Sequence, residues 1–169
     1  MAIIGRTGGG KTTIAELLLR NYDVNQGEIL IDGVDIRNHE LQNLRSRLGY
    51  VPQDSFLFSD TISKNVSFGN PDVNQAEIEK YCAYASIDSD IKELPEGYGT
   101  VVGERGVTLS GGQKQRISIA RALIKRPDMI ILDDCLSAVD TKTEQTKCLQ
   151  QKYFPIKLVI IVIIFLASL

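Results

Sequence analysis

This sequence has no excess of basic residues, few cysteines and a single histidine, and these shortages restrict its possible functions and location. Lysine and arginine number 19 against 21 acidic residues, and a net charge of −2 argues against a broad nucleic-acid-binding surface. The three cysteines, Cys82, Cys135 and Cys148, are odd in number and lack metal-ligand spacing, so a reducing compartment fits best. Histidine occurs once, as His39, which we expect at the surface near a helix start.

The sequence also lacks an apolar run long enough for a transmembrane helix, which needs about 17–25 residues. Its longest apolar segment extends from Leu158 to Leu166, and its valine and isoleucine content favours a buried strand. If exposed, the same segment would be aggregation-prone. Deletion of the residues after Pro155 would then improve solubility, unless the segment is a core strand.

Short apolar segments alternate with helical patterns along the chain. Apolar residues make up 43% and charged residues 24%, which is typical of a packed domain. The pattern predicts strands at 1–4, 28–31, 48–51 and 129–132, and helices at 12–19 and 113–125. Residues 60–91 should be mostly helical, with Asn74 and Asp88 as helix caps. This alternation predicts an α/β fold around a mainly parallel sheet.

A glycine-rich loop between the first strand and the first helix fits the Walker A pattern, G-x-x-x-x-G-K-[ST]. Its glycines allow backbone N–H groups to face phosphate oxygens, and the following helix directs its positive end toward the same anion. Lys11 can then reach the β- and γ-phosphates, and Thr12 can bind Mg²⁺. The loop comprises Gly5, Arg6, Thr7, Gly8, Gly9, Gly10, Lys11 and Thr12.

A second glycine pair starts the helix predicted at 113–125. Ser110, Gly111 and Gly112 would form another phosphate-binding helix end, with Gln113 following them. One domain rarely needs two such ends for one triphosphate, so the second end would serve the nucleotide of another subunit. The alternative is an ordinary helix cap with a glycine turn.

The segment 129–133 is similar to a Walker B strand, because it is apolar and ends in a carboxylate, Asp133. At the end of a buried strand, Asp133 would hold Mg²⁺ through water, opposite Thr12. Alone, this segment is a weak indication of a Walker B strand. The indication is stronger because the segment follows a phosphate loop and the Ser-Gly-Gly-Gln segment.

The order of these motifs, with residues 50–53 between the first two and 137–140 after Asp133, resembles that of the ATPase domain of an ABC transporter. The resemblance covers residues 1 to about 144 and implies a P-loop NTPase (RecA-like) core at 1–53 and 113–146. It further implies an inserted α-helical subdomain at 54–112 and a divergent apolar tail at 147–169. Most of the family's antiparallel β-subdomain and its adenine-stacking aromatic would be missing.

The resemblance also assigns roles to individual residues. Lys11, Gln53 and Asp134 would be catalytic, Asp134 as the general base, and Thr12, Gln53 and Asp133 would hold Mg²⁺. Residues 110–112 would be the family's signature motif, which in a head-to-tail dimer contacts ATP bound by the opposite subunit. Asp140 would lie at the dimer interface. The implied ATP-binding residues are Gly5, Thr7, Gly8, Gly9, Gly10, Lys11, Thr12 and Thr13, with Ser110, Gly111, Gly112 and Gln113 from the signature.

The flanking loops resemble those of exporters. Residues 54–62 are similar to an exporter Q-loop, and residues 102–106 are similar to an X-loop, in which Glu104 would meet a transmembrane domain. The implied partners are therefore a second ATPase domain and a membrane domain, with no nucleic acid. The implied location is the cytoplasmic face of the cell membrane.

The sequence departs from the family pattern in two catalytic features. Asp134 replaces the usual glutamate, which shortens the arm of the base by one methylene, and no switch histidine follows the 137–140 segment. Two hypotheses therefore stay open. The chain is either the ATPase of an exporter or a non-catalytic module that binds ATP and completes a partner's site. A chromosome-maintenance ATPase is disfavoured by the exporter-like loops and by the absence of coiled-coil heptads.

Overall fold

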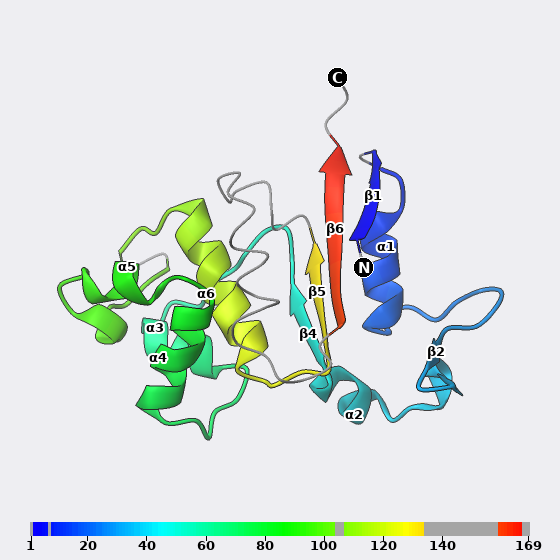
Figure 1. Cartoon of the computed structure of the whole chain (residues 1–169), viewed down its shortest axis with the longest axis horizontal. Helices are drawn as coiled ribbons and strands as arrows, with labels where there is room; N and C mark the ends of the chain where they lie inside the picture. The colour runs from blue at the N-terminus through cyan, green and yellow to red at the C-terminus, as the bar shows by residue number, and fades with distance from the viewer. Residues whose placement is uncertain (1, 7, 104–106, 134–158, 167–169) are drawn as a thin grey trace.

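A four-stranded parallel sheet forms the centre of the molecule (Figure 1). The structure, a computed structural model, describes residues 2–6, 8–103, 107–133 and 159–166. The strand order is β1-β6-β5-β4, and every neighbouring pair is parallel. The strands are β1 (Ala2–Arg6), β4 (Leu48–Val51), β5 (Met129–Asp133) and β6 (Val159–Leu166). The predicted α/β class is confirmed.

Alternate residues of β5 pack against helices on opposite faces of the sheet. Ile131 packs with Ala15 of α1 (Lys11–Leu18) on one face. Ile130 and Leu132 join the main core beside α6 (Gly111–Leu123) on the other face. Because every second side chain of a strand faces the same way, a continuously apolar strand requires cover on both faces.

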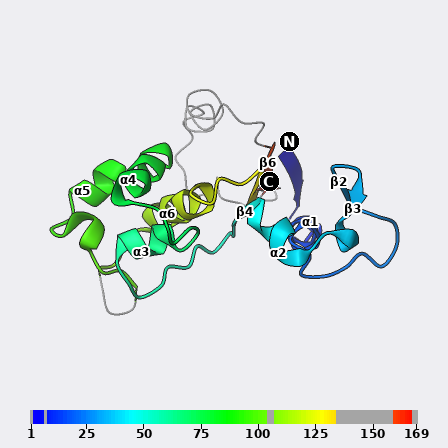
Figure 2. The same cartoon turned by 90° about the horizontal axis from the view of Figure 1, so that it is seen from below.

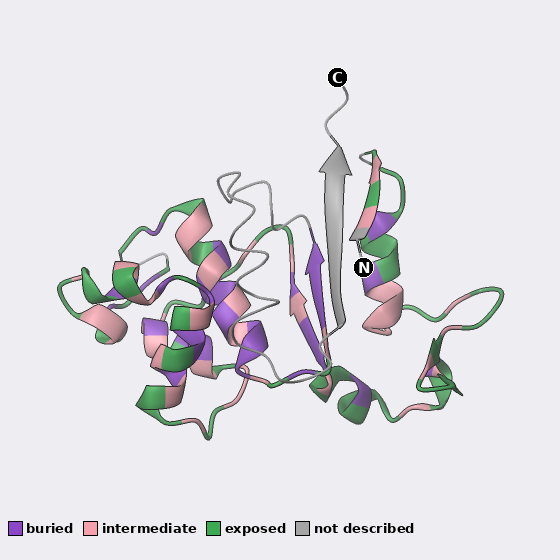
Figure 3. Cartoon of the chain, in the orientation of Figure 1, coloured by how far each residue is buried: buried purple, intermediate pink, exposed green. Residues whose placement is uncertain are grey.

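A helical lobe lies on the α6 side of the sheet (Figure 2). It contains α3 (Ile62–Ser67), α4 (Gln75–Tyr84), α5 (Asp88–Lys92) and the 3₁₀ turn η2 (Gly97–Gly99). α6 packs against both α3 and α4, so it belongs as much to this lobe as to the sheet. The buried residues of the lobe line its inner surfaces (Figure 3), and the fully buried ones include Ile62, Val66, Ile87, Ile91, Ile117 and Leu123.

The apolar run near the end of the sequence is a central strand. β6 pairs with β1 in the register Ala2↔Val162 and with β5 in the register Met129↔Val159. The interpretation as a strand is confirmed. Without β6, neither β1 nor β5 would have its partner on that side.

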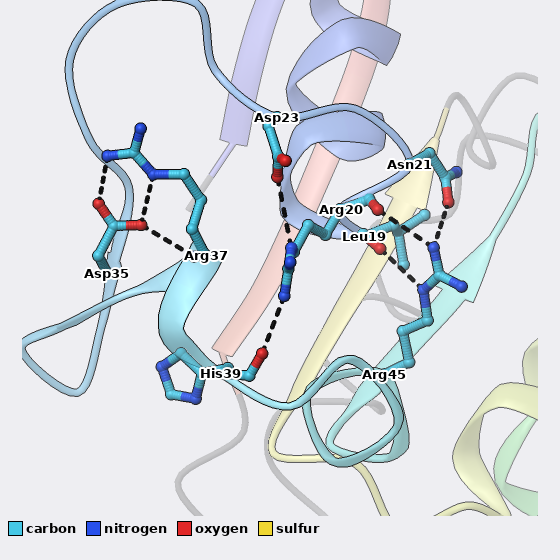
Figure 4. A network of polar contacts seen from close by, with 8 residues as sticks. All are labelled: Leu19, Arg20, Asn21, Asp23, Asp35, Arg37, His39 and Arg45. Atoms are coloured by element: carbon cyan, nitrogen blue, oxygen red, sulfur yellow. Dashed lines mark hydrogen bonds and ion pairs between the residues drawn. The ribbon is translucent and has the colours of Figure 1, made fainter.

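A small region beyond the C-terminal end of α1 contains β2 (Leu30–Ile31), β3 (Val34–Asp35), the 3₁₀ turn η1 (Ile36–Asn38) and α2 (Leu41–Ser46). β2 and β3 pair antiparallel through a turn at Asp32-Gly33, where both residues have positive φ. Arg45 of α2 donates to the carbonyls of Leu19 and Arg20 and to Asn21 Oδ1 (Figure 4). It thereby satisfies carbonyls at the end of α1 that have no helical partner.

The helix ends correct two expectations. Asn74 caps α4 as predicted, through Glu77 N–H at 3.0 Å. Asp88, in contrast, is not a cap: Ile87 holds that position, and Asp88 instead accepts bonds from Tyr98 and Lys92. α6 begins two residues earlier than the predicted Gln113, because Ser110 is the capping residue. None of the described helices is long and apolar enough to cross a membrane.

Candidate functional site

Three of the predicted motifs follow the ends of parallel strands. The loop 7–10 follows β1, Asp133 ends β5, and Gln53 lies two residues beyond β4. The β4–β5 register pairs Val51 with Leu132, so Gln53 and Asp133 lie at the same edge of the sheet. In open α/β sheets, ligands bind at the carboxyl ends of the strands, which is the edge where these motifs meet.

The backbone of the glycine-rich loop adopts conformations that only glycine adopts readily. Gly8 has a φ of 78°, and Gly10, the N-cap of α1, has a φ of 75°. At Gly9, a Cβ would lie 3.0 Å from the carbonyl oxygen of Arg6, which already accepts the N–H of Gly9. A side chain at any of these positions would strain the loop, so the glycines are required by its shape.

Lys11 lies folded over its own loop rather than pointing into solvent. Its side chain is 4% exposed, and Nζ donates to the carbonyl of Arg6 at 2.5 Å. A Cβ on Gly5 would be 3.9 Å from Nζ, so the ammonium group sits directly above the end of β1. A buried ammonium beside a helix N-terminus forms a strongly anion-attracting site.

Asp133 is a buried carboxylate at the sheet edge, 1% exposed. The hydroxyl of Tyr50, on the neighbouring strand β4, donates to its Oδ2 at 3.3 Å. This contact orients the carboxylate. Thr12, Thr13 and Gln53 are solvent-exposed.

The N-terminus of α6 is organised by reciprocal hydrogen bonds. Ser110 Oγ accepts the N–H of Gln113 at 3.2 Å, and Gln113 Oε1 accepts the N–H of Ser110 at 3.0 Å, which together form a capping box. The hydroxyl hydrogen of Ser110 takes part in neither bond. It therefore remains as a donor next to the N–H groups of Gly111 and Gly112, in the first turn of the helix.

This helix end opens onto solvent. Ser110 and Gly111 are exposed, and a Cβ on Gly111 would meet nothing within 4 Å. Below it, Leu109 is 6% exposed and anchors the segment in the core of the helical lobe. The arrangement is a rigid helix end with an open approach, which fits a phosphate group brought by another molecule.

A groove of about 570 Å³ separates the segment after Gln53 from the segment before Ser110. The two walls are held together by backbone contacts: the N–H of Val102 donates to Asp60 O at 3.0 Å, and Thr61 pairs with Val101. At Gly103, with φ of 102°, a Cβ would lie 2.7 Å from Ser59 Oγ. The residues that line the groove include Phe56, Leu57, Val107, Thr108 and Lys114.

Several predicted site residues lie outside the described residues, namely Thr7, Glu104, Asp134 and Asp140. His39, half-buried just before α2, is close to the expected position; its Nε2 is 3.3 Å from the carbonyl of Ile31. β6 passes beside Asp133 in the register Asp133↔Ile163, and its sequence is apolar from Val159 to Leu166. The strand beside Asp133 thus supplies no titratable side chain there.

Sequence reasoning missed the polar residues that support the motifs. Tyr50 was part of the motif leading to Gln53, but its bond to Asp133 requires the parallel pairing of β4 and β5. Asp90 and Arg116 meet across 26 positions, and Asn65 and Arg121 across 56 positions. Spacing within one helix provides no signal for such contacts between helices.

The chain matches the ABC transporter family over residues 1–137. It belongs to that family. Members of this family are ATPases, and the matched region includes the phosphate loop, the strand ending at Asp133 and the helix end at Ser110.

Its relatives come from distant organisms. The chain is 51% identical to the ATM1-type heavy metal exporter of Novosphingobium aromaticivorans over 145 residues, which are 86% of this chain and 24% of that protein. It is 47% identical to heavy metal tolerance factor 1 of Caenorhabditis elegans over 153 residues, 89% of this chain and 19% of that protein. The chain thus spans about a fifth to a quarter of these relatives.

A solved structure of a bacterial Atm1-family ABC exporter with ATP bound shares the fold. Its TM-score is 0.90 at 45% identity, and the match covers 98% of this chain and 29% of that chain. The likeness supports the predicted architecture of a P-loop NTPase domain.

Proposed function

We propose that the chain is the Mg-ATP-binding part of an ABC exporter, in which ATP binding and hydrolysis drive transport across a membrane. The observation that carries this proposal is the sheet edge itself, where the loop with Gly8 and Gly10, the buried Lys11 and the buried Asp133 meet. A triphosphate would lie against the loop N–H groups and Lys11, which stabilise negative charge as the γ-phosphate is attacked.

The residues at this edge suit Mg²⁺ as well as phosphate. Oxygen donors are the ligands that Mg²⁺ prefers, and the Thr12 hydroxyl, the Gln53 amide oxygen and the Asp133 carboxylate provide three. The ion, when bound with ATP, would supply charge neutralisation on the phosphate oxygens. Asp133 is oriented by Tyr50, so its carboxylate is fixed before any ligand arrives. Gln53 orients the attacking water, and Asp134 accepts its proton.

The second function that remains in view is a non-catalytic module, favoured by the apolar strand beside Asp133. β6 brings Ile163 into register with Asp133, where a histidine would be needed nearby to stabilise the transferred phosphate. Asp134 is also shorter than the usual glutamate. Under this proposal the chain binds ATP in its own site without hydrolysing it. Its helix end at Ser110 completes the site of a partner subunit.

We propose that a membrane-domain partner docks in the groove between the Q-loop segment and the X-loop segment. The exposed Phe56 provides apolar contact area, and Lys114 provides a positive group at the other wall. The joined walls would move as one unit, because backbone bonds connect residues 60–61 with residues 101–102. Such a surface suits an amphipathic segment with an acidic end, and docking of that segment would hold the chain at the cytoplasmic face of the membrane.

The experiment is a mixed assembly of this chain with a complete exporter ATPase domain. Steady-state ATPase activity is measured for the chain alone, for the partner alone and for the mixture. We expect the mixture to be active, because the partner provides a complete Walker site and this chain provides Ser110. Ser110→Ala in this chain should abolish the added activity, whereas Asp134→Asn should change it little.

The two functions give opposite results for the chain alone. Fast hydrolysis without a partner, lost on Asp134→Asn, would establish this chain as an autonomous ATPase. Loss of a catalytic interaction costs a factor of about 10² or more, so the two outcomes are easily separated. A mixture that shows no activity beyond that of the partner, with or without Ser110→Ala, would contradict the proposed role of the helix end.

A further inference from the structure

One carboxylate outside the nucleotide site is connected directly to the start of α6. Asp90, in the first turn of α5, accepts Gln113 Nε2 at 3.3 Å and Arg116 Nη2 at 2.6 Å on the same oxygen, Oδ2. Gln113 is also the residue that closes the capping box with Ser110. A chain of polar contacts therefore extends from Asp90 through the Gln113 amide to the backbone of Ser110.

The chemistry of Asp90 determines which way the Gln113 amide faces. A carboxylate only accepts hydrogen bonds, so the amide must present its NH₂ group to Asp90. Its oxygen then faces the opposite direction and accepts the N–H of Ser110. If the amide were reversed, its NH₂ group would face the N–H of Ser110, two donors would oppose each other, and the capping box would be lost.

Arg116 holds the Asp90 carboxylate in the position from which it accepts the Gln113 amide. The side chain of Asp90 is 30% exposed and that of Arg116 is 24% exposed, so the pair is partly removed from water. Leu109, Ile91 and Ile117 pack beside Asp90 and Gln113. A charge-assisted bond at the edge of an apolar core is stronger and better directed than one at an open surface.

We propose that Asp90 is a positioning residue for the signature segment: through Gln113 it fixes the backbone of Ser110, and so the direction in which the Ser110 hydroxyl points. This inference rests on the proposed role of Ser110 toward a partner's nucleotide. Asp90 itself touches no nucleotide. Its effect reaches the partner's site only through the Gln113 amide.

The first test reads the hydrogen bonds themselves and needs no partner. In a ¹⁵N-labelled full chain, Asp90→Ala should shift the backbone amide resonance of Ser110 and the side-chain amide resonances of Gln113. The control is Asp88→Ala, which removes a carboxylate from the same helix but one that contacts Tyr98 and Lys92. Unchanged Ser110 and Gln113 resonances in Asp90→Ala would overturn the proposal.

The second test reads the consequence in the mixed assembly. Lys11→Ala is included in this chain, so that only the partner's Walker site turns over. Asp90→Ala should lower kcat by about tenfold and leave the KM for ATP within about twofold, because a displaced Ser110 hydroxyl acts mainly on the reacting geometry. Asp90→Asn, which keeps one acceptor oxygen and is the milder change, should give a smaller loss. Asp88→Ala should leave kcat unchanged.

A charge exchange separates positioning from a simple ion pair. The double variant D90R/R116D restores opposite charges between α5 and α6, but it presents donors where Gln113 needs an acceptor. We expect the thermal stability of the double variant to recover relative to Asp90→Ala, while kcat stays low. Recovery of kcat together with stability would overturn the proposal, since a structural ion pair alone would then explain the loss.

The roles of Ser110 and Asp90 can be disproved independently. If Ser110→Ala leaves the activity of the mixed assembly intact, the proposed function of the helix end is wrong. The role of Asp90 in orienting Gln113 is then decided by the amide resonances alone. If Ser110→Ala abolishes activity while Asp90→Ala changes neither kcat nor the resonances, the positioning role is wrong and the function of Ser110 stands.

Discussion

Arg121 of α6 holds Asn65 of α3 by two separate hydrogen bonds, donating to its backbone carbonyl at 2.7 Å and to its Oδ1 at 2.8 Å. Asn65 in turn accepts the N–H of Phe58 at 2.8 Å and donates to the carbonyls of Phe58 and Thr61 at 3.0 Å. The side chain of Asn65 is 1% exposed. One amide thus fixes the segment that follows Gln53 against α6, the helix that Ser110 caps.

Replacement of this amide should therefore destabilise the fold. Asn65→Ala removes the Oδ1 acceptor of the Phe58 N–H and of one Arg121 nitrogen, at a cost of about 2–4 kcal/mol. Urea unfolding followed by circular dichroism measures this change. Asn43→Ala, an exposed asparagine within α2, is the control and should change the unfolding free energy little. Equal losses of unfolding free energy in the two variants would show that the buried hydrogen bonds of Asn65 do not stabilise the fold.

The phosphate loop should lose most of its affinity without its lysine. Lys11→Ala removes the buried ammonium above β1, and we expect ATP affinity to fall by at least about tenfold. Titration with a fluorescent ATP analogue measures the dissociation constant. The matched control is Lys64→Ala. Lys64 is an exposed lysine of α3 that forms an ion pair with Asp60. Unchanged affinity in Lys11→Ala would rule out this loop as the triphosphate site.

The central position of β6 can be tested through its backbone. Ile161 pairs with Ile131, and β6 has a neighbouring strand on each side. Ile161→Pro removes an N–H from the ladder and should destabilise the domain by about 3 kcal/mol or more. Ile161→Val keeps the N–H and serves as the control in thermal unfolding. Deletion of the residues after Pro155 should likewise unfold the domain, whereas improved solubility with retained ATP binding would contradict the observed pairing.

Cys82 should be chemically inert in the folded protein. It is fully buried in the helical lobe, and burial raises the pKa of its thiol from its ordinary value of 9.0 to about 12. Labelling with iodoacetamide at pH 8, in a Cys135→Ser/Cys148→Ser background, should be slow and should become fast in denaturant. Asn43→Cys in a Cys82→Ser version of the same background gives the rate for an exposed thiol.

The same pKa shift predicts the sign of a pH effect on stability. Between about pH 9 and pH 12 the unfolded thiol loses its proton while the folded thiol keeps it, so the unfolded state binds fewer protons. The contribution of Cys82 to stability is therefore fully present below pH 9 and is lost as the pH rises toward 12. Cys82→Ser should flatten this part of the stability profile, and an unchanged profile would contradict the shift.

The sequence predicted the elements whose signals are local. The strands at β4 and β5 were placed within one residue, because short apolar runs end there at Pro52 and at Asp133-Asp134. The strand and helix that flank the glycine-rich loop were predicted because glycine spacing and apolar periodicity coincide in one short segment. Ser110 was recognised as part of a helix start for the same reason, although the helix itself begins two residues earlier than predicted.

The contacts that support the site could not be predicted in the same way. Asp88 was expected to cap α5, but its carboxylate is taken by Tyr98, ten positions further along the chain. The bond between Tyr50 and Asp133 depends on strand pairing, and the contact of Asp90 with Gln113 depends on how α5 packs against α6. These are properties of tertiary packing, which periodicity and capping patterns do not encode.

The sheet order has a consequence for the time course of folding. β1, from which the phosphate loop extends, has β6 as its strand neighbour, and the pairing of Ala2 with Val162 joins positions about 160 residues apart. At synthesis rates of roughly 5–20 residues per second, β1 leaves the ribosome roughly 8–30 s before that neighbour exists. Closing so long a loop is slow, and the open edge of β1 is a site for wrong pairing in the interval. The loop that we propose binds the triphosphate is thus synthesised well before the strand that completes its support.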